Sequence, residues 1–151
     1  MNAEVLRLIG KISRALDSIA NIEFKDLNLN RGQYLYLVRV YEHPQIILEE
    51  LALMLRVDKT TASRAVNKLV KQGLIQKQKD AQSLKRQLLS VTDEGTKLAK
   101  FILKENDYSE NQALKGFDYE QIRQLISLLE MVDANLLADY QLVKSGKTRN
   151  Y

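Results

Sequence analysis

The chain has 151 residues, of which 23 are Lys or Arg and 19 are Asp or Glu, so its formal net charge is only +4. Hydrophobic residues make up 45% of the sequence, which is enough to build a core and excludes a disordered chain. There is no Cys, one histidine (His43), six glycines and one proline, a composition that excludes disulfides, leaves little for a metal site or a catalytic triad, and favours long helices.

Two helices are predicted before the proline. Between residues 2 and 24 the apolar side chains recur at intervals of three and four residues, which places them on one face of a helix. Residues 31–41 are apolar on nearly every side, so we expect this second helix to be buried in the middle of the fold. It should end at His43, because Pro44 disfavours helical geometry in the residue before it.

A short helix and a longer helix follow, joined by a tight turn. Residues 49–55 (EELALML) predict the short helix and residues 59–72 the longer one, which Gly73 ends. Asp58 is a good N-cap, because its carboxylate can accept hydrogen bonds from the exposed amides of the first turn. The inward face of the longer helix is formed by Ala62, Val66, Leu69 and Val70.

A β-hairpin and two further helices complete the chain. Residues 74–79 and 87–91 are predicted strands, and residues 80–86 are expected to form a polar tip between them. Thr92 should cap the next helix. The polar stretch 104–116 fits either a continuation of that helix or a loop.

The last helix has a recognisable beginning. Asp118 and Gln121 fit a variant of the capping box at its head. Its apolar residues recur in a heptad-like stripe. Residues 145–151 are expected to be a frayed tail.

The order of short helix, turn, longer helix and hairpin is typical of a winged helix-turn-helix. In that arrangement the second helix enters the major groove of DNA and the hairpin, or wing, reaches the adjacent backbone. The charge is distributed accordingly: residues 56–86 carry a net charge of +7, whereas the other 120 residues carry −3. Such a local concentration is typical of a phosphate-binding surface.

The outer face of the longer helix carries side chains suited to reading DNA. Arg can donate two hydrogen bonds to guanine, Asn can pair with adenine, and hydroxyl groups can bind phosphates or bases. The predicted contacts are Arg56, Lys59, Thr60, Thr61, Ser63, Arg64, Asn67 and Lys68 from the helix-turn-helix, with Lys85 and Arg86 from the wing. The alternative is an ordinary solvated helix face with surface lysines.

Residues 48–98 resemble the multiple-antibiotic-resistance regulator (MarR) family. The motifs that carry the resemblance are a Leu-Ala helix, the turn VDKTT, the segment SRAVNKLVKQGLI, a wing, and VTDEG at the start of the next helix. The resemblance implies a homodimeric transcription factor, usually a repressor, that binds pseudo-palindromic DNA and often releases it on binding a small molecule.

The expected fold is therefore mainly α with a small β-wing, in a single domain over residues 1–151. Residues 31–91 would form the winged helix-turn-helix lobe that binds double-stranded DNA. Residues 1–26 and 92–144 would supply the helices of the dimerisation lobe.

Two departures from the family pattern concern the DNA-binding lobe. The family wing usually reads Asp-x-x-Asp-Arg-Arg, but here Asp80 is followed by Ser83 and Leu84 at the next two aligned positions, which puts the wing's internal salt bridge in doubt. Arg56 stands where the family commonly has Gly or Asn. If this position requires a positive φ, Arg costs about 1 kcal/mol there, and a phosphate contact would offset that cost.

Apolar stripes near both ends of the chain predict a two-fold dimer, because they exceed what a lobe of this size needs to cover itself. The predicted interface residues are Ile9, Ile12, Leu16, Ile126, Leu129, Val132 and Leu136. The alternative is that these helices complete the core of a monomer.

The resemblance also implies an effector pocket where the dimer helices meet the DNA-binding lobe, and its candidate lining residues are Phe24, Tyr34, Tyr36 and Tyr41. Aromatic side chains on a helix more often belong to a core than to a ligand site. With one histidine and no Cys we expect no metal and no cofactor. An organic effector, a partner protein or no effector remain as alternatives.

Two other functional classes compete with a DNA-binding regulator. One is a winged-helix module for protein interaction, whose basic charge is incidental. The other is an enzyme. The sequence argues against this class, because the chain has no Cys, one His and no Gly-rich phosphate loop. The sequence also has no apolar run that is long enough for a membrane span or a signal peptide, so we expect a cytoplasmic protein.

Overall fold

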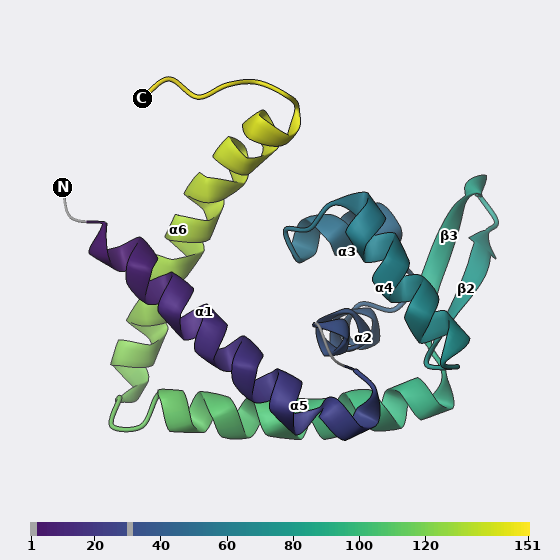
Figure 1. Cartoon of the computed structure of the whole chain (residues 1–151), viewed down its shortest axis with the longest axis horizontal. Coiled ribbons are helices and arrows are strands. Elements are labelled where there is room, and N and C mark those ends of the chain that lie inside the picture. The colour runs from purple at the N-terminus through teal and green to yellow at the C-terminus, as the bar shows by residue number, and fades with distance from the viewer. Residues whose placement is uncertain (1–2, 30–31) are drawn as a thin grey trace. The chain divides into compact units, whose positions relative to one another are not determined.

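The computed structural model of the chain describes residues 3–29 and 32–151. The chain forms two compact units, Met1–Ser109 and Glu110–Tyr151. The elements run in the order α1 (Glu4–Glu23), a 3₁₀ turn (Lys25–Leu27), α2 (Gln33–Glu42), β1 (Ile46–Ile47), α3 (Leu48–Met54), α4 (Lys59–Lys71), β2 (Ile75–Asp80), β3 (Ser83–Val91), α5 (Asp93–Ala113) and α6 (Tyr119–Lys144) (Figure 1).

The predicted helices of the first unit are confirmed, with ends that differ from the expectation by up to two residues. The starts expected at residues 2 and 31 lie outside the described residues. Helix α2 ends at Glu42, and His43 before Pro44 has a non-helical backbone, as the proline predicts. No helix in the described ranges is both long and apolar enough to cross a membrane.

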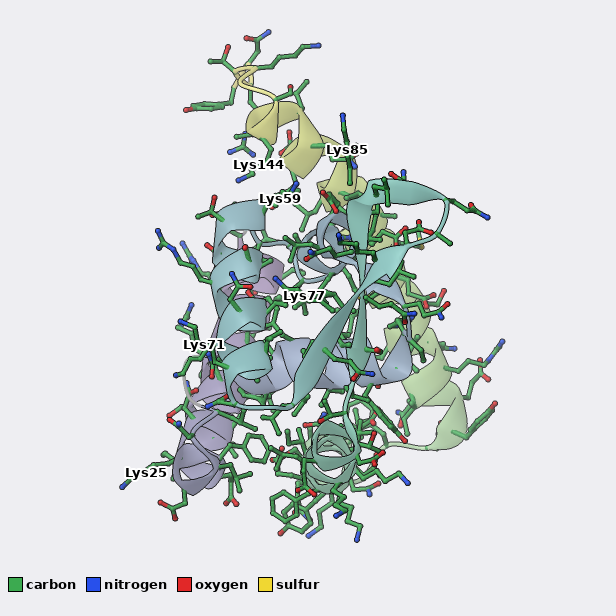
Figure 2. All side chains as sticks on the ribbon, turned by 90° about the vertical axis from the view of Figure 1, so that its right-hand side faces the viewer. Lys25, Lys59, Lys71, Lys77, Lys85 and Lys144 are labelled. Carbon is green, nitrogen blue, oxygen red and sulfur yellow. The ribbon has the colours of Figure 1, made fainter. Side chains whose placement is uncertain are left out.

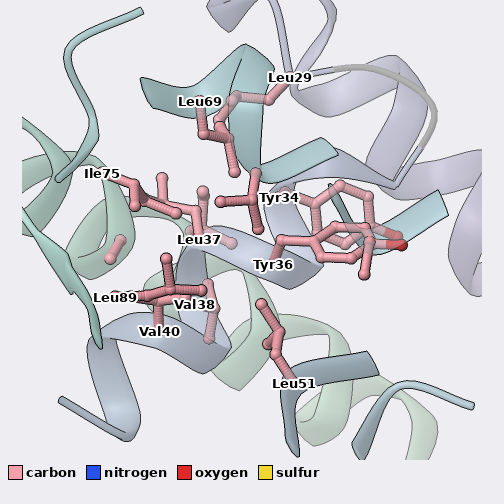
Figure 3. Close-up of a cluster of buried hydrophobic side chains, with 14 of the residues drawn as sticks. Leu29, Tyr34, Tyr36, Leu37, Val38, Val40, Leu51, Leu69, Ile75 and Leu89 are labelled. Atoms are coloured by element: carbon pink, nitrogen blue, oxygen red, sulfur yellow. The ribbon is translucent and has the colours of Figure 1, made fainter. Parts of the chain in front are cut away.

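The core of the first unit surrounds α2 (Figure 3). Five apolar side chains of this ten-residue helix are buried: Tyr34, Tyr36, Leu37, Val38 and Val40. They share one cluster with Leu51 of α3, Leu69 of α4 and Leu89 of β3. Helix α2 is therefore the central element that the sequence predicts.

The sheet has three antiparallel strands in the order β1-β3-β2. Strand β1 was not expected from the sequence. It is only two residues long, and it pairs Ile46 with Leu89 and Ile47 with Leu88. It anchors the start of α3 to the base of the wing, because α3 begins at the residue that follows it.

The wing differs from the sequence prediction at its tip. The expected polar tip at residues 80–86 is wrong, because Asp80 already pairs with Ser83 and only two residues form the turn. Lys79 pairs with Gln87, so the segment 84–86 has no partner on β2 and forms a bulge in β3. The Asp80 carboxylate accepts a hydrogen bond from the Gln82 amide at 3.0 Å, which stabilises the turn.

The end of the wing is joined closely to α5. The Thr92 hydroxyl donates to the Gly73 carbonyl at 2.6 Å and accepts from the Gly95 amide at 3.1 Å, so Thr92 caps α5 as predicted. Gly95 lies directly against the backbone of Leu74: a Cβ atom at this position would be 2.0 Å from the Leu74 carbonyl oxygen. Only glycine permits this approach of the helix to the wing.

The second unit consists of the end of α5 and helix α6. Helix α5 continues to Ala113, so most of the ambiguous stretch 104–116 is helical. Helix α6 begins with the predicted capping box: the Asp118 carboxylate accepts from the Gln121 amide at 2.8 Å, and the Gln121 side chain accepts from the Asp118 amide at 3.0 Å. The predicted tail, 145–151, is exposed, and its Arg149 is 2.8 Å from the Asp139 carboxylate of α6.

We predict that Gly95→Ala destabilises the protein although alanine favours helices. The added Cβ must displace the Leu74 carbonyl, and overpacking of this kind costs about 1–3 kcal/mol. The matched control is Gly10→Ala in α1, where the nearest atom belongs to the flexible Arg14 side chain at 3.1 Å. The control should gain up to about 1 kcal/mol from helix propensity. Urea unfolding followed by circular dichroism measures both changes, and a Gly95→Ala protein as stable as the wild type would contradict the close packing of Gly95 on Leu74.

Candidate nucleic-acid interface

Helix α4 begins at a well-formed cap. The Asp58 carboxylate accepts hydrogen bonds from the Thr61 amide at 2.8 Å and from the Thr61 hydroxyl at 3.1 Å. This confirms the N-cap predicted from the sequence. It stabilises the first turn of α4, directly after the turn that joins α3 to α4.

Arg56 occupies the turn between α3 and α4 with a left-handed backbone, at φ 54°. The positive φ considered for this position is therefore observed. The guanidinium folds back on α3, where Nη1 donates to the Leu53 carbonyl at 2.6 Å. This hydrogen bond to the end of α3 offsets part of the cost of the strained backbone.

The structure brings most of the predicted DNA contacts of α4 to the surface. Ala62, Val66 and Leu69 are buried beneath them. Lys59, Thr60, Thr61, Arg64, Asn67 and Lys68 are exposed, and Ser63 and Arg56 are half-buried. Helix α4 therefore presents a largely exposed polar and basic face.

A groove of about 200 Å³ separates the start of α4 from the wing. It is lined by Leu48, Glu49, Lys59, Ser63, Val66, Lys77, Leu84, Lys85, Arg86, Gln87 and Leu89. The bulge at residues 84–86 places both predicted wing cations in this groove, beside α4 and away from the turn of the hairpin. Leu84, from the same bulge, is 82% exposed.

Two charged residues of the groove were not predicted as site residues. Lys77 reaches from β2 toward α4, where its Nζ donates to Asn67 Oδ1 at 2.6 Å (Figure 2). Glu49, in the first turn of α3, forms an ion pair of 2.6 Å with Lys59. The hydrogen bond from Lys59 lowers the pKa of the Glu49 carboxyl below its ordinary value, and its own backbone amide and the charge of Arg86 act in the same direction. Both contacts join residues ten positions apart in separate elements, beyond the reach of the spacing within one helix or strand.

The four aromatic candidates for an effector pocket lie in or beside the core. Phe24, Tyr34 and Tyr36 are buried, and Tyr41 is half-buried. The Phe24 and Tyr34 rings are in contact, with centroids 5.2 Å apart. Burial, together with the nearby Asp17 carboxylate, raises the pKa of Tyr34 to about 12. These side chains therefore contribute to packing, which is the alternative the sequence favoured.

The predicted dimer residues remain largely uncovered in the single chain. In α1, Ile12 and Leu16 are exposed and Ile9 is half-buried. In α6, Ile126, Leu129 and Leu136 are exposed and Val132 is half-buried, and none of the residues of α6 is fully buried. Each unit thus carries a stripe of apolar side chains in water.

Over the described ranges, no cluster of three or more His, Asp or Glu side chains could hold a metal ion.

We predict that Asp58→Ala lowers the free energy of unfolding by about 1 kcal/mol, because the first turn of α4 loses its cap. Asn caps helices about as well as Asp, so Asp58→Asn should retain most of the stability. Chemical denaturation of the three proteins checks this. Equal losses in both variants would assign the role of Asp58 to its charge and not to capping.

Comparison with known proteins identifies the family. The model of the MarR family matches residues 29–86. The chain is 51% identical over 148 residues to an uncharacterized HTH-type transcriptional regulator, YybA, of Bacillus subtilis (strain 168), a match that covers 98% of this chain and 99% of that protein. A putative MarR family transcriptional regulator from Listeria monocytogenes, solved in complex with a 26mer DNA, has a TM-score of 0.94 and 49% identity over 97% of both chains. An uncharacterized SlyA-like transcription regulator from the same organism has a TM-score of 0.90 and also 49% identity, over 97% of both chains. These matches confirm the resemblance and the mainly helical, winged fold predicted from the sequence: the chain belongs to the MarR family of transcriptional regulators.

Proposed function

We propose that this chain binds double-stranded DNA as a homodimer and represses transcription from a pseudo-palindromic operator. The observation that carries the proposal is the exposed basic and polar face of α4 beside a groove with four cationic side chains. Such a face matches a helix that reads base edges in the major groove, and cations beside it match the flanking phosphates. The Listeria relative solved with DNA supports the same partner for this chain.

In the proposed complex, the roles follow from side-chain chemistry. Arg64 carries the donors for two hydrogen bonds to guanine, and Asn67 carries the donor and acceptor that pair with adenine. Lys85 and Arg86, in the bulge of β3, supply charge to the backbone beside the recognition helix. Lys77 joins them, because its ammonium group lies within 2.6 Å of Asn67.

Homodimerisation is proposed from the uncovered apolar stripes. Ile12 is 56% exposed in α1 and Leu136 is 48% exposed in α6, which is costly in water unless a second copy covers them. A two-fold dimer presents two recognition helices about 34 Å apart on one face of the duplex. Binding to chromosomal DNA would place the protein in the cytoplasm.

We further propose that a small organic effector releases the DNA. Three of the four aromatic side chains considered for its pocket are buried in the core. An effector that reaches them must therefore separate α2 from its neighbours, and the position of α4 depends on the same packing. This would couple effector binding to the DNA-reading helix.

Selection of bound duplexes from a random pool tests the function and the dimer together. We expect an inverted repeat whose half-sites are centred about 10 base pairs, or one helical turn, apart. Affinity for the selected duplex should fall steeply with salt. Enrichment of a single half-site would contradict the dimer, and the absence of any enriched sequence would favour a protein-interaction module.

Substitutions should separate base contacts from phosphate contacts. Arg64→Ala and Asn67→Ala should each reduce discrimination between operator and scrambled DNA by about 1–3 kcal/mol. Lys85→Ala and Arg86→Ala should weaken both duplexes alike and reduce the salt slope by about 1. Lys100→Ala, an exposed lysine of α5 that does not line the groove, is the charge-matched control. Competition binding measures all five variants, and unchanged discrimination in the α4 variants would contradict the proposed reading helix.

A further inference from the structure

Glu49 is the single carboxylate among the side chains that line the basic groove within the described residues. The four cations around it come from three elements: Lys59 from α4, Lys77 from β2, and Lys85 and Arg86 from β3. An acidic side chain is unexpected in a surface that attracts phosphates, because it repels them. Its position therefore needs a reason.

The geometry gives Glu49 one defined partner. Its Oε1 lies 2.6 Å from Nζ of Lys59, the first residue of α4. The two side chains are 57% and 64% exposed, so both are open to solvent and to an approaching duplex. The pair bridges the two helices of the helix-turn-helix on the side that faces the wing bulge.

Such a pair contributes little to folding, because exposed ion pairs are screened by water and salt. Its main effect is on what Lys59 can bind. Carboxylate and phosphate oxygens accept the same charge-assisted hydrogen bonds from an ammonium group. A phosphate that approaches Lys59 therefore competes with Glu49 for its charge.

We propose that Glu49 weakens phosphate binding by this groove, because its carboxylate competes with DNA phosphates for Lys59. Binding without sequence preference comes almost wholly from phosphate contacts, so the removal of one cation from that set weakens it. Glu49 thus sets the strength of the phosphate contacts that this groove can make, and this inference rests on the proposed function in DNA binding.

The first test compares Glu49→Gln with Glu50→Gln on a duplex of scrambled sequence over a series of salt concentrations. Both residues lie in the first turn of α3, so both variants lose the same charge at the same helix end, but Glu50 does not line the groove. Freeing Lys59 adds one phosphate contact, which steepens the slope of log K against log salt by about 0.9 and tightens binding up to about eightfold at 0.1 M salt. Glu50→Gln should change both quantities much less. Equal effects of the two variants would overturn the proposal.

A double-mutant cycle then identifies the partner. In a Lys59→Gln background, Glu49→Gln should lose its excess effect over Glu50→Gln, because no cation remains to be released. An undiminished effect in that background would show that Glu49 acts by general repulsion, and would overturn its assignment as a competitor for Lys59. Thermal unfolding of every variant verifies that α3 still forms.

The wild type in the same assays separates this inference from the proposed function. Failure of the wild type to bind either the selected or the scrambled duplex would overturn both. If the wild type binds DNA but the Glu49→Gln and Glu50→Gln variants have the same affinity and salt slope, the role of Glu49 alone is overturned.

Discussion

The burial of α2 is the constraint on which the first unit depends. A helix that is apolar on nearly every side is stable in water only when other elements surround it. Helices α3 and α4 and strand β3 all pack against it and share its core cluster. This packing fixes α4 by its inner face, through Ala62, Val66 and Leu69, and leaves its outer face free to bind a partner.

The groove also requires that the wing and α4 keep fixed positions relative to each other, because its shape depends on both. Strand β1 ties the start of α3 to β3, and the contact of Gly95 with Leu74 ties α5 to the base of β2. The Thr92 hydroxyl adds a hydrogen bond to the carbonyl of Gly73, two residues after the end of α4. Backbone contacts at the base of the wing thus position cations that lie on its exposed part.

Sequence patterns predicted what depends on local periodicity and capping. The helices, the Asp58 cap, the Asp118 capping box and the polar face of α4 follow from residues three or four positions apart. The two-residue strand β1 was missed because a pair of isoleucines carries no detectable alternation. The prediction placed the wing tip wrongly, because in the sequence the three unpaired residues of β3 are indistinguishable from residues of a longer loop. The Glu49–Lys59 pair depends on how α3 meets α4, and such tertiary contacts are not visible in sequence spacing.

The bulge in β3 explains how the wing can depart from the family pattern and still contribute cations to the proposed DNA-binding surface. A regular hairpin would alternate its side chains between the two faces of the ribbon, so that neighbouring residues point in opposite directions. The unpaired segment 84–86 is released from this alternation, and Lys85 and Arg86 both line the groove beside α4. The turn itself is closed by Asp80 through the Gln82 amide and needs no salt bridge to an arginine. The cations of the wing and of α4 consequently form one surface, in which the carboxylate of Glu49 determines how much of the charge of Lys59 a duplex meets.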